Sequence, residues 1–333
     1  MIIQHEIEAT PDALRGGVFA LGNFDGVHRG HRAVIDAAGA LARAEDRPWG
    51  VITFEPHPRE FFQASSVPFR LTPFRQKARL LNNLGIDVLV NLPFAGDMAG
   101  RTAQDFVMDV LVDGLGLAHV VTGPGFVFGK GRRGNGYVLG HMASMEGFGY
   151  TEIETYLDQS KKVSSTEIRV LLRRGQVDRA NALLGHLWEF EGRVEPGEKR
   201  GRTMGFPTAN LPLDGRLHPG PGIYAVRAGL AETGAEGWDS GTTWYDGAAY
   251  IGTRPTFDGK TVVLETYLFD FDGDLYDQRL RVAFVERVRK DMTFTGMDDL
   301  ARQMEDDCNR ARDILAGVQG GSPESAGLPV GVA

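Results

Sequence analysis

Two histidines stand three residues apart in a glycine-containing segment that directly follows a short apolar stretch. The segment reads GNFDGVHRGH over residues 22–31 and contains His28 and His31. Glycines let a backbone approach phosphate closely, and the start of a helix presents backbone amides with a partial positive charge. Imidazole N–H groups can stabilise charge that grows on a phosphorus centre. The segment therefore predicts a phosphate-binding loop. The alternative is that one histidine caps a helix and the other is solvated.

Two further segments carry side chains suited to the same ligand. The segment VSSTEIR, residues 163–169, places hydroxyl groups one turn before Arg169, which could clamp a phosphate. Any single serine in it is better explained as an ordinary helix N-cap. The segment FEPHP, residues 54–58, ends an apolar stretch in a turn and makes His57 a candidate. Histidines flanked by prolines are often turn residues, so this alternative stays open.

A second group of polar side chains lies in the other half of the chain, in GRTMGFPTAN, residues 201–210. In an extended segment Thr208 and Asn210 project to the same side. Hydroxyl and carboxamide oxygens are hard ligands suited to magnesium and its phosphates. The alternative is a proline turn that enters a strand.

Glu265 is the single charged residue of the apolar segment TVVLETYLF, residues 261–269. Alternation along a strand allows it either a solvent-facing position or a buried one. A buried carboxylate would be a better general base near neutral pH, because desolvation raises its pKa. Glu265 is therefore a candidate catalytic base.

Length and composition limit the class of protein. The chain has 333 residues, of which 42% are hydrophobic and 24% charged, which predicts a globular protein of two domains. Its 36 basic and 44 acidic side chains leave a formal charge of −8, which argues against a nucleic-acid partner. The one cysteine excludes an intrachain disulfide, and neither a secretion signal nor an apolar run of about 20 residues is visible. We expect a cytoplasmic protein without a membrane partner.

The first half alternates short apolar stretches with helical patterns, which predicts a doubly wound parallel sheet. Val34, Ile35 and Ala38 fall on one face of a helix after the first strand. The expected strands are Val18–Leu21, Trp49–Phe54, Val88–Leu92, His119–Thr122 and Thr151–Leu157, and further helices are expected over Phe74–Leu84 and Ala103–Leu115.

From about His186 the pattern changes to strands separated by glycine and proline turns, which predicts a small antiparallel barrel. An amphipathic helix around Leu300–Leu315 should cover it, and an enlarged hairpin loop is expected from about Leu230 to Trp244. The barrel strands are expected over Leu187–Val194, Ile223–Ala228, Trp244–Ile251, Thr261–Phe269 and Arg279–Val288.

Taken together and in this order, GNFDGVHRGH, FEPHP and SSTEIR resemble the FMN adenylyltransferase domain of bacterial bifunctional FAD synthetases, within the nucleotidyltransferases that carry an HxGH motif. The resemblance covers about Val18–Leu184. It implies attack of the FMN phosphate on the α-phosphorus of ATP, with His28, His31 and Arg169 as catalytic residues. It also implies nucleotide contacts by Gly22, Asn23, Phe24, Asp25, Gly30, Ser164, Ser165 and Thr166, and flavin contacts by Asp25, His57 and Phe126.

The motifs GRTMGFPTAN, IGTRPTF and LETYLFDF resemble the riboflavin kinases, over about His186–Leu315. This resemblance implies that Glu265 removes the proton of the ribityl 5′-hydroxyl, and that Thr208 and Asn210 bind magnesium and the phosphates of ADP. Nucleotide contacts are implied for Gly201, Gly205, Thr208 and Asn210, and a flavin contact for Arg312.

The two resemblances predict a Rossmann-like nucleotidyltransferase domain over residues 1–185, a riboflavin kinase β-barrel with a C-terminal helix over 186–316, and a disordered tail over 317–333. Riboflavin, FMN and ATP would be the substrates, FMN and FAD the products, and magnesium the metal. A homo-oligomer is an open alternative.

Three further hypotheses stay open. One is that adenylyltransferase activity has been lost, because Gly125 and Val127 stand where family members usually carry polar residues. Another is an RNA-related protein, since tRNA synthetases share the HxGH element. The last is a flavin sensor that binds its ligand without turnover.

Overall fold

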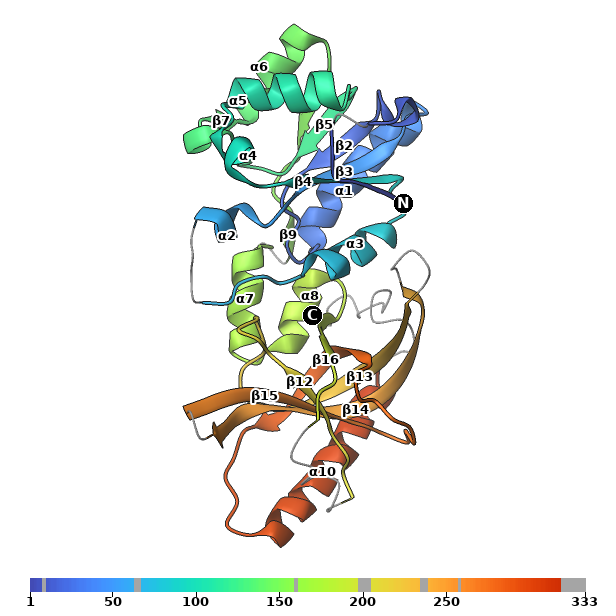
Figure 1. Cartoon of the computed structure of the whole chain (residues 1–333), viewed down its shortest axis with the longest axis vertical. Helices are drawn as coiled ribbons and strands as arrows, with labels where there is room; N and C mark the ends of the chain where they lie inside the picture. The colour runs from blue at the N-terminus through green and yellow to red at the C-terminus, as the bar shows by residue number, and fades with distance from the viewer. Residues whose placement is uncertain are drawn as a thin grey trace. The chain divides into compact units, whose positions relative to one another are not determined.

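The computed structural model describes residues 1–7, 10–62, 67–158, 161–196, 205–233, 239–256 and 259–318 (Figure 1). Contacts between residues divide the chain into two units. Unit 1 comprises Met1–Ser66 and Thr72–Ser164, and unit 2 comprises Val67–Leu71 and Ser165–Ala333. Each unit has its own sheet and its own hydrophobic core. Among the described residues, no helix is long and apolar enough to cross a membrane.

The sheet of unit 1 has six strands that are all parallel, in the order β1-β4-β3-β2-β5-β8. Strand β2 lies between β3 and β5, and its first residue, Val18, pairs with the first residue of each, Trp49 and His119. The predicted doubly wound, Rossmann-like fold is confirmed. The strands are β1 (Ile2–Gln4), β2 (Val18–Leu21), β3 (Trp49–Glu55), β4 (Val88–Pro93), β5 (His119–Thr122) and β8 (Gly149–Glu152).

Helices cover both faces of this sheet because its strands are apolar on both sides. Phe19 and Leu21 share a core cluster with Leu111 and Leu139 on one side. On the other side, Trp49 of β3 donates from Nε1 to the carbonyl of Ile35 (3.1 Å). The helices are α1 (Arg29–Ala44), α2 (Pro58–Phe62), α3 (Phe74–Asn82), α4 (Gly96–Gly100), α5 (Ala103–Asp105), the π-helix η2 (Phe106–Gly114) and α6 (Gly136–Glu146), with short 3₁₀ turns η1 (Asp12–Leu14) and η3 (Lys130–Arg132).

Two predictions for this sheet were incomplete or wrong. The edge strand β1 was missed, because three residues are too few to show a periodicity. The strand expected over Thr151–Leu157 is β8, which ends at Glu152. After it the chain leaves the sheet and forms a separate hairpin from β9 (Leu157–Asp158) and β10 (Lys161–Lys162). A second small hairpin joins β6 (Val127–Phe128) to β7 (Gly134–Asn135).

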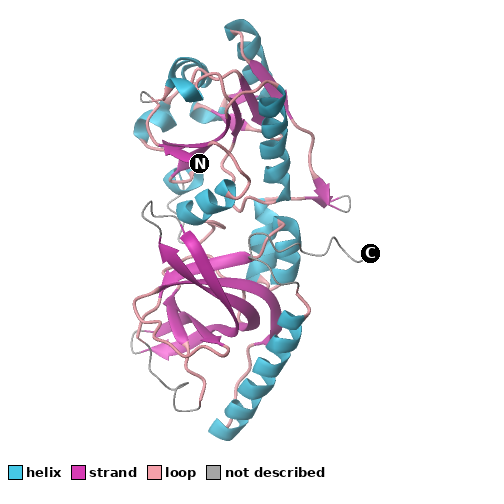
Figure 2. Cartoon of the chain, turned by 90° about the vertical axis from the view of Figure 1, so that its right-hand side faces the viewer, coloured by secondary structure: helices cyan, strands magenta, loops and turns pink. Residues whose placement is uncertain are grey.

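Unit 2 is built on a curved antiparallel sheet in the order β11-β16-β13-β14-β15-β12 (Figure 2). The chain just after edge strand β11 reaches the other edge strand, β12, at one backbone bridge, where Glu195 N donates to Asn210 O (2.9 Å). The predicted antiparallel barrel with a C-terminal helix is therefore confirmed. The strands are β11 (Trp188–Arg193), β12 (Ala209–Pro212), β13 (Gly222–Thr233), β14 (Asp239–Thr256), β15 (Gly259–Leu268) and β16 (Arg279–Lys290).

The long helix α10 (Met297–Ala316) packs on the outer face of the sheet, where Ala311 and Leu315 join a core cluster with Ala283 and Val285. A bidentate ion pair fixes it there. Arg289 of β16 donates from Nη2 and Nε to the Asp307 carboxylate, at 2.7 and 2.8 Å.

The prediction of an enlarged loop from Leu230 to Trp244 was wrong in its bounds. Strands β13 and β14 continue into it and pair as far as Thr233 and Asp239, so it is a long hairpin. Most of the predicted disordered tail, residues 319–333, lies outside the described residues.

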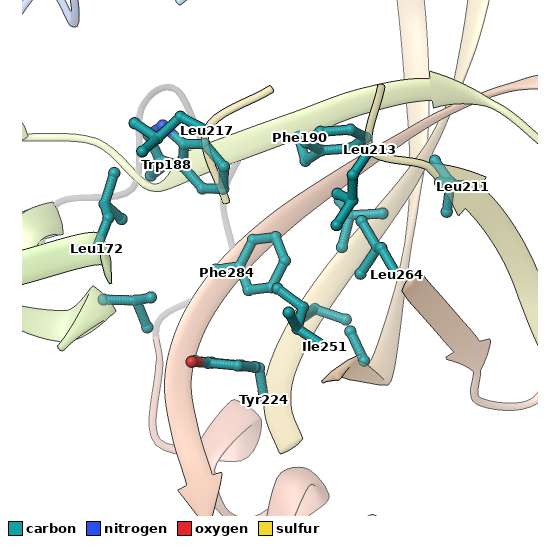
Figure 3. Packing of buried hydrophobic residues seen from close by; sticks show 14 of the residues in the cluster. Leu172, Trp188, Phe190, Leu211, Leu213, Leu217, Tyr224, Ile251, Leu264 and Phe284 are labelled. Atoms are coloured by element: carbon teal, nitrogen blue, oxygen red, sulfur yellow. The ribbon is translucent and has the colours of Figure 1, made fainter. Parts of the chain in front are cut away.

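Two helices that precede the barrel in sequence belong to its core. Helices α7 (Ser165–Arg173) and α8 (Val177–Leu184) bury Ile168, Leu172 and Leu184 in the cluster that fills the inside of the curved sheet (Figure 3). Asn181 joins them further: its Nδ2 donates to Phe284 O, and its Oδ1 accepts from Trp188 N, both at 2.8 Å. The contact units thus divide at Ser164/Ser165, whereas the sequence predicts a boundary at 185/186.

A fragment that begins at Ser165 should therefore melt at a higher temperature than one that begins at His186. The shorter fragment loses the apolar faces of α7 and α8, and each buried leucine contributes about 1.5–3 kcal/mol. Thermal unfolding of both fragments, followed by circular dichroism, measures this difference. Equal melting temperatures would mean that the two helices add nothing to the barrel and would favour the boundary at 185/186.

Candidate active sites

The segment GNFDGVHRGH, residues 22–31, which we call the histidine loop, leaves the carboxyl end of β2 and runs into the first turn of α1, as predicted. Its backbone is strained, since Phe24 (φ 47°) and Val27 (φ 40°) both adopt positive φ values. Such values are uncommon for non-glycine residues and are outliers for a β-branched one. Strain of this kind persists only where the surrounding structure over-determines the backbone, and it is concentrated at functional sites.

The two histidine rings stack on each other, with 3.5 Å between ring centroids and 14° between planes. His28 is the N-cap of α1, and its Nδ1 accepts from His31 N at 3.2 Å. The neutral His28 ring then carries its proton on Nε2. His31 is half-buried rather than solvated, and the Phe24 ring meets it edge-on at 5.4 Å. His28 therefore does cap the helix, as the alternative proposed. In this position its ring stacks on that of His31 at the start of the helix.

Asp25 is buried, and its Oδ1 accepts from Thr72 N at 3.1 Å. The Thr72 hydroxyl in turn accepts from Gly26 N at 3.0 Å. These bonds tie the histidine loop to the segment that starts α3. The Asp25 carboxylate therefore braces the loop, and its nucleotide and flavin contacts stay predictions.

His57 lies in the turn between β3 and α2 and is buried. Its Nδ1 accepts from Arg59 N at 3.1 Å, which caps this short helix. The predicted turn role is therefore present, and a flavin contact by His57 stays a prediction.

Seven phenylalanine rings form a continuous chain of ring contacts in unit 1, which we call the phenylalanine cluster. Neighbouring centroids lie 5.2–6.1 Å apart, and most pairs are tilted or edge-on. Two rings are exposed, Phe61 by 44% and Phe62 by 66%. The members are Phe54, Phe61, Phe62, Phe94, Phe106, Phe126 and Phe128. Of these the sequence singled out Phe126 alone. The FF pair at 61–62 was the available signal for an exposed aromatic surface.

Gly125 lies in the loop between β5 and β6 with a φ of +69°, and a Cβ added there would meet no atom within 4 Å. Asp and Asn tolerate this left-handed region better than other side chains. The backbone thus permits the polar residue that the resemblance led us to expect there, and the space beside Gly125 is open. Val127 is half-buried in β6.

The segment VSSTEIR, residues 163–169, is divided between the two units. Ser164 ends unit 1, whereas Ser165 begins α7 in unit 2, and Thr166 is exposed there. Arg169 is buried in unit 2, where its Nε donates to Phe69 O (2.5 Å) and its guanidinium lies 5.3 Å from the Phe69 ring centroid. Its predicted role as a phosphate clamp stays a prediction.

Glu265 is buried on β15, at 9% exposure, so the solvent-facing alternative is excluded. Its register partner on β12 is Asn210, and its Oε2 accepts from Thr208 Oγ1 at 3.4 Å. The structure therefore brings together the carboxylate, the hydroxyl and the amide that the sequence singled out. Gly205 precedes them with a φ of +85°, and Gly201 lies outside the described residues.

An aromatic row extends from Glu265 along one side of the chain, since Tyr267 on β15 and Phe269, just after the end of that strand, follow at two-residue spacing. Phe206 meets Tyr267 at 5.6 Å, and Tyr267 meets Phe269 at 5.7 Å. Arg312 of α10 lies over the Phe269 ring at 4.2 Å and is paired with Asp270 at 2.9 Å. This candidate flavin residue is thus at the end of a row of rings that begins beside Glu265.

Lys77 of α3 is a buried charged residue that the sequence analysis missed. It falls on the apolar face of α3 with Leu80 and Leu81, and its Nζ donates to Asn23 O in the histidine loop (2.9 Å). A lysine at helical spacing from buried leucines was the signal that could have found it.

Comparison with protein families gives two matches along the chain. The family described as FAD synthetase matches residues 10–167, and the family described as riboflavin kinase matches residues 184–315. The first match covers the histidine loop and FEPHP but ends two residues before Arg169, and the second covers the motifs of the Glu265 site.

Comparison with characterised proteins and solved structures gives matches over most of the chain. The bifunctional riboflavin kinase/FMN adenylyltransferase of Escherichia coli K12 is 38% identical over 313 residues, which cover 93% of this chain and 96% of that protein. The protein of the same name from Bacillus subtilis is 36% identical over 315 residues, with 93% and 96% coverage. A crystal structure from Streptococcus pneumoniae, named macrolide-efflux protein, is 28% identical with a TM-score of 0.81, and covers 94% of this chain and 98% of that one.

Proposed function

Because this chain belongs to the family of bifunctional riboflavin kinases/FMN adenylyltransferases, we propose that its two reactions use two separate groups of side chains. The chain phosphorylates riboflavin to FMN with ATP, and it joins FMN to the adenylyl group of a second ATP, giving FAD and pyrophosphate. The histidine loop serves the second reaction. Glu265 with Thr208 and Asn210 serves the first.

For adenylyl transfer, His28 and His31 hold the ATP phosphates at the start of α1. An oxygen of the FMN phosphate attacks the α-phosphorus, the bond from that phosphorus to the bridging oxygen breaks, and pyrophosphate leaves. Charge grows on the phosphate oxygens, and imidazole donors placed beforehand stabilise it without reorganisation. The stacked rings 3.5 Å apart are the observation that supports this role.

The phenylalanine cluster is the surface on which we place the isoalloxazine ring of FMN. Its exposed rings Phe61 and Phe62 stand edge-on to each other and offer an apolar surface, and both also meet the Phe94 ring. Aromatic pairs of this kind contribute about 0.5–1.5 kcal/mol beyond the area that they bury.

For phosphoryl transfer, Glu265 accepts the proton of the ribityl 5′-hydroxyl while that oxygen attacks the γ-phosphorus of ATP and ADP leaves. Phosphoryl transfer needs mainly positioning and charge neutralisation, so one base beside the phosphates suffices. The burial of Glu265 beside Thr208 is the observation that carries this assignment.

The donor set beside Glu265 fits magnesium, because the hydroxyl of Thr208 and the carboxamide oxygen of Asn210 are hard oxygen ligands. These two residues would hold the ion, which when bound neutralises charge on the phosphates. We place both reactions in the cytoplasm, where ATP is available. The formal charge of −8 supports small-molecule substrates rather than nucleic acid.

Arg169→Ala should raise the KM for ATP in adenylyl transfer and leave riboflavin phosphorylation nearly unchanged, because a phosphate clamp contributes binding. Steady-state kinetics of both reactions measure this. Arg173→Ala is a matched control, since Arg173 also donates to the 67–71 segment, at Pro68 O (2.7 Å). If both substitutions change the KM for ATP equally, Arg169 acts by bracing residues 67–71 rather than by binding phosphate.

A further inference from the structure

Lys77 is wholly buried, with 0% exposure, directly beside the histidine loop. Its Nζ donates to Asn23 O at 2.9 Å and to Thr53 Oγ1 at 3.2 Å. The Thr53 hydroxyl donates to the same carbonyl of Asn23 at 3.2 Å. Two side chains from different elements, α3 and β3, therefore converge on one backbone oxygen of the loop.

That oxygen lies just before the strained part of the loop. Asn23 immediately precedes Phe24, whose φ is 47°. The Phe24 ring is buried and meets His31 edge-on, and His31 stacks on His28. A shift of the Asn23 carbonyl would thus be transmitted through Phe24 to both histidine rings.

Stability alone explains this lysine poorly. Removing an ammonium group from water costs several kcal/mol, and well-packed apolar residues of similar volume are often neutral or stabilising in such places. A methionine would fill nearly the same space without that cost. The lysine therefore fits a position where a donor must hold the loop in an otherwise unfavourable conformation.

We propose that Lys77 is a positioning residue for adenylyl transfer, which sets the histidine loop by holding the Asn23 carbonyl. It acts on the reaction through His28 and His31, so the proposal rests on the function assigned to these histidines above. The kinase reaction in unit 2 does not depend on it.

The test is Lys77→Met in the full chain, with Lys290→Met, an exposed lysine at the end of β16, as the control. We expect Lys77→Met to fold with a melting temperature near that of the wild type. Its kcat for adenylyl transfer should fall about 10–100-fold, because small displacements of catalytic groups cost rates of that order. The KM for ATP should rise by a smaller factor, because the two histidines also hold the ATP phosphates. The rate of riboflavin phosphorylation should change little.

A second readout separates positioning from a general loss of structure. Stacked rings shift each other's NMR signals, so the Cε1 proton signals of His28 and His31 should move in Lys77→Met, with assignments from His28→Gln and His31→Ala. Thr53→Val removes the second donor to Asn23 O while keeping its shape, and it should lower the same kcat to a smaller extent. If Lys77→Met does not fold, the kcat of Thr53→Val for adenylyl transfer tests the proposal in its place.

Wild-type kcat in these variants, or a reduced kcat with unmoved histidine signals, would overturn the proposal. His31→Ala, measured in parallel, separates this failure from that of the assigned function. If His31→Ala loses adenylyl transfer and Lys77→Met does not, the positioning role alone is wrong. If His31→Ala also retains it, the role of the histidines is wrong.

Discussion

Glu265→Gln should almost abolish FMN formation from riboflavin, while FMN supplied to the same variant is still converted into FAD. The substitution keeps the size of the side chain and its bond from Thr208, but it removes the base. General base catalysis typically contributes about 10²–10⁴-fold, so we expect kcat for phosphorylation to fall by that factor. Separation of the flavins after incubation with riboflavin, and separately with FMN, measures both reactions.

The control for this substitution is Glu286→Gln, which changes an exposed glutamate on β16 of the same sheet. It should leave both reactions unchanged. If Glu265→Gln still phosphorylates riboflavin at the wild-type rate, Glu265 is not the base, and its burial beside Thr208 serves another purpose.

His31→Ala should have the opposite pattern, with FAD formation suppressed and FMN formation nearly intact. Removal of one preorganised donor to a developing anion typically costs about 10²–10³-fold in kcat. Release of pyrophosphate from FMN and ATP measures the loss, and release of ADP with riboflavin measures the other reaction.

His141→Ala is the matched control, because His141 is exposed on α6 of the same unit. Equal loss of both reactions in a folded His31→Ala variant would refute the assignment of His31 to adenylyl transfer alone.

Local patterns were sufficient for most of the fold. Buried strands such as β2 and β5 were located to the residue, because short apolar stretches bounded by glycine and polar residues are typical of buried parallel strands. The packing of α7 and α8 into the core of the barrel could not be predicted in this way. The spacing of apolar residues predicts that each helix has a buried face, but it does not predict which of the two sheets that face packs on.

The same limit applies to what the sequence could predict of the sites. Thr208, Asn210 and Glu265 were named from their types, and the strand pairing of β12 with β15 brings them together. The phenylalanine cluster as a whole was missed, because its rings come from separate elements and only Phe126 was singled out. Lys77 was missed because its contact with Asn23 joins α3 to a distant loop. Whether Glu265 is buried also depended on pairing, since alternation allows either face.

The most direct test of two independent sites is to mix Glu265→Gln with His31→Ala, each of which lacks one of the two reactions. Glu265→Gln alone should make no FAD from riboflavin and ATP, and His31→Ala alone should stop at FMN. A mixture of the two should make FAD, because FMN released by His31→Ala can enter the intact histidine site of Glu265→Gln. The contradicting result is a mixture of two folded variants that yields no FAD, together with a Glu265→Gln variant that does not convert supplied FMN. The barrel would then have to contribute to adenylyl transfer, and the account of separate sites would be wrong.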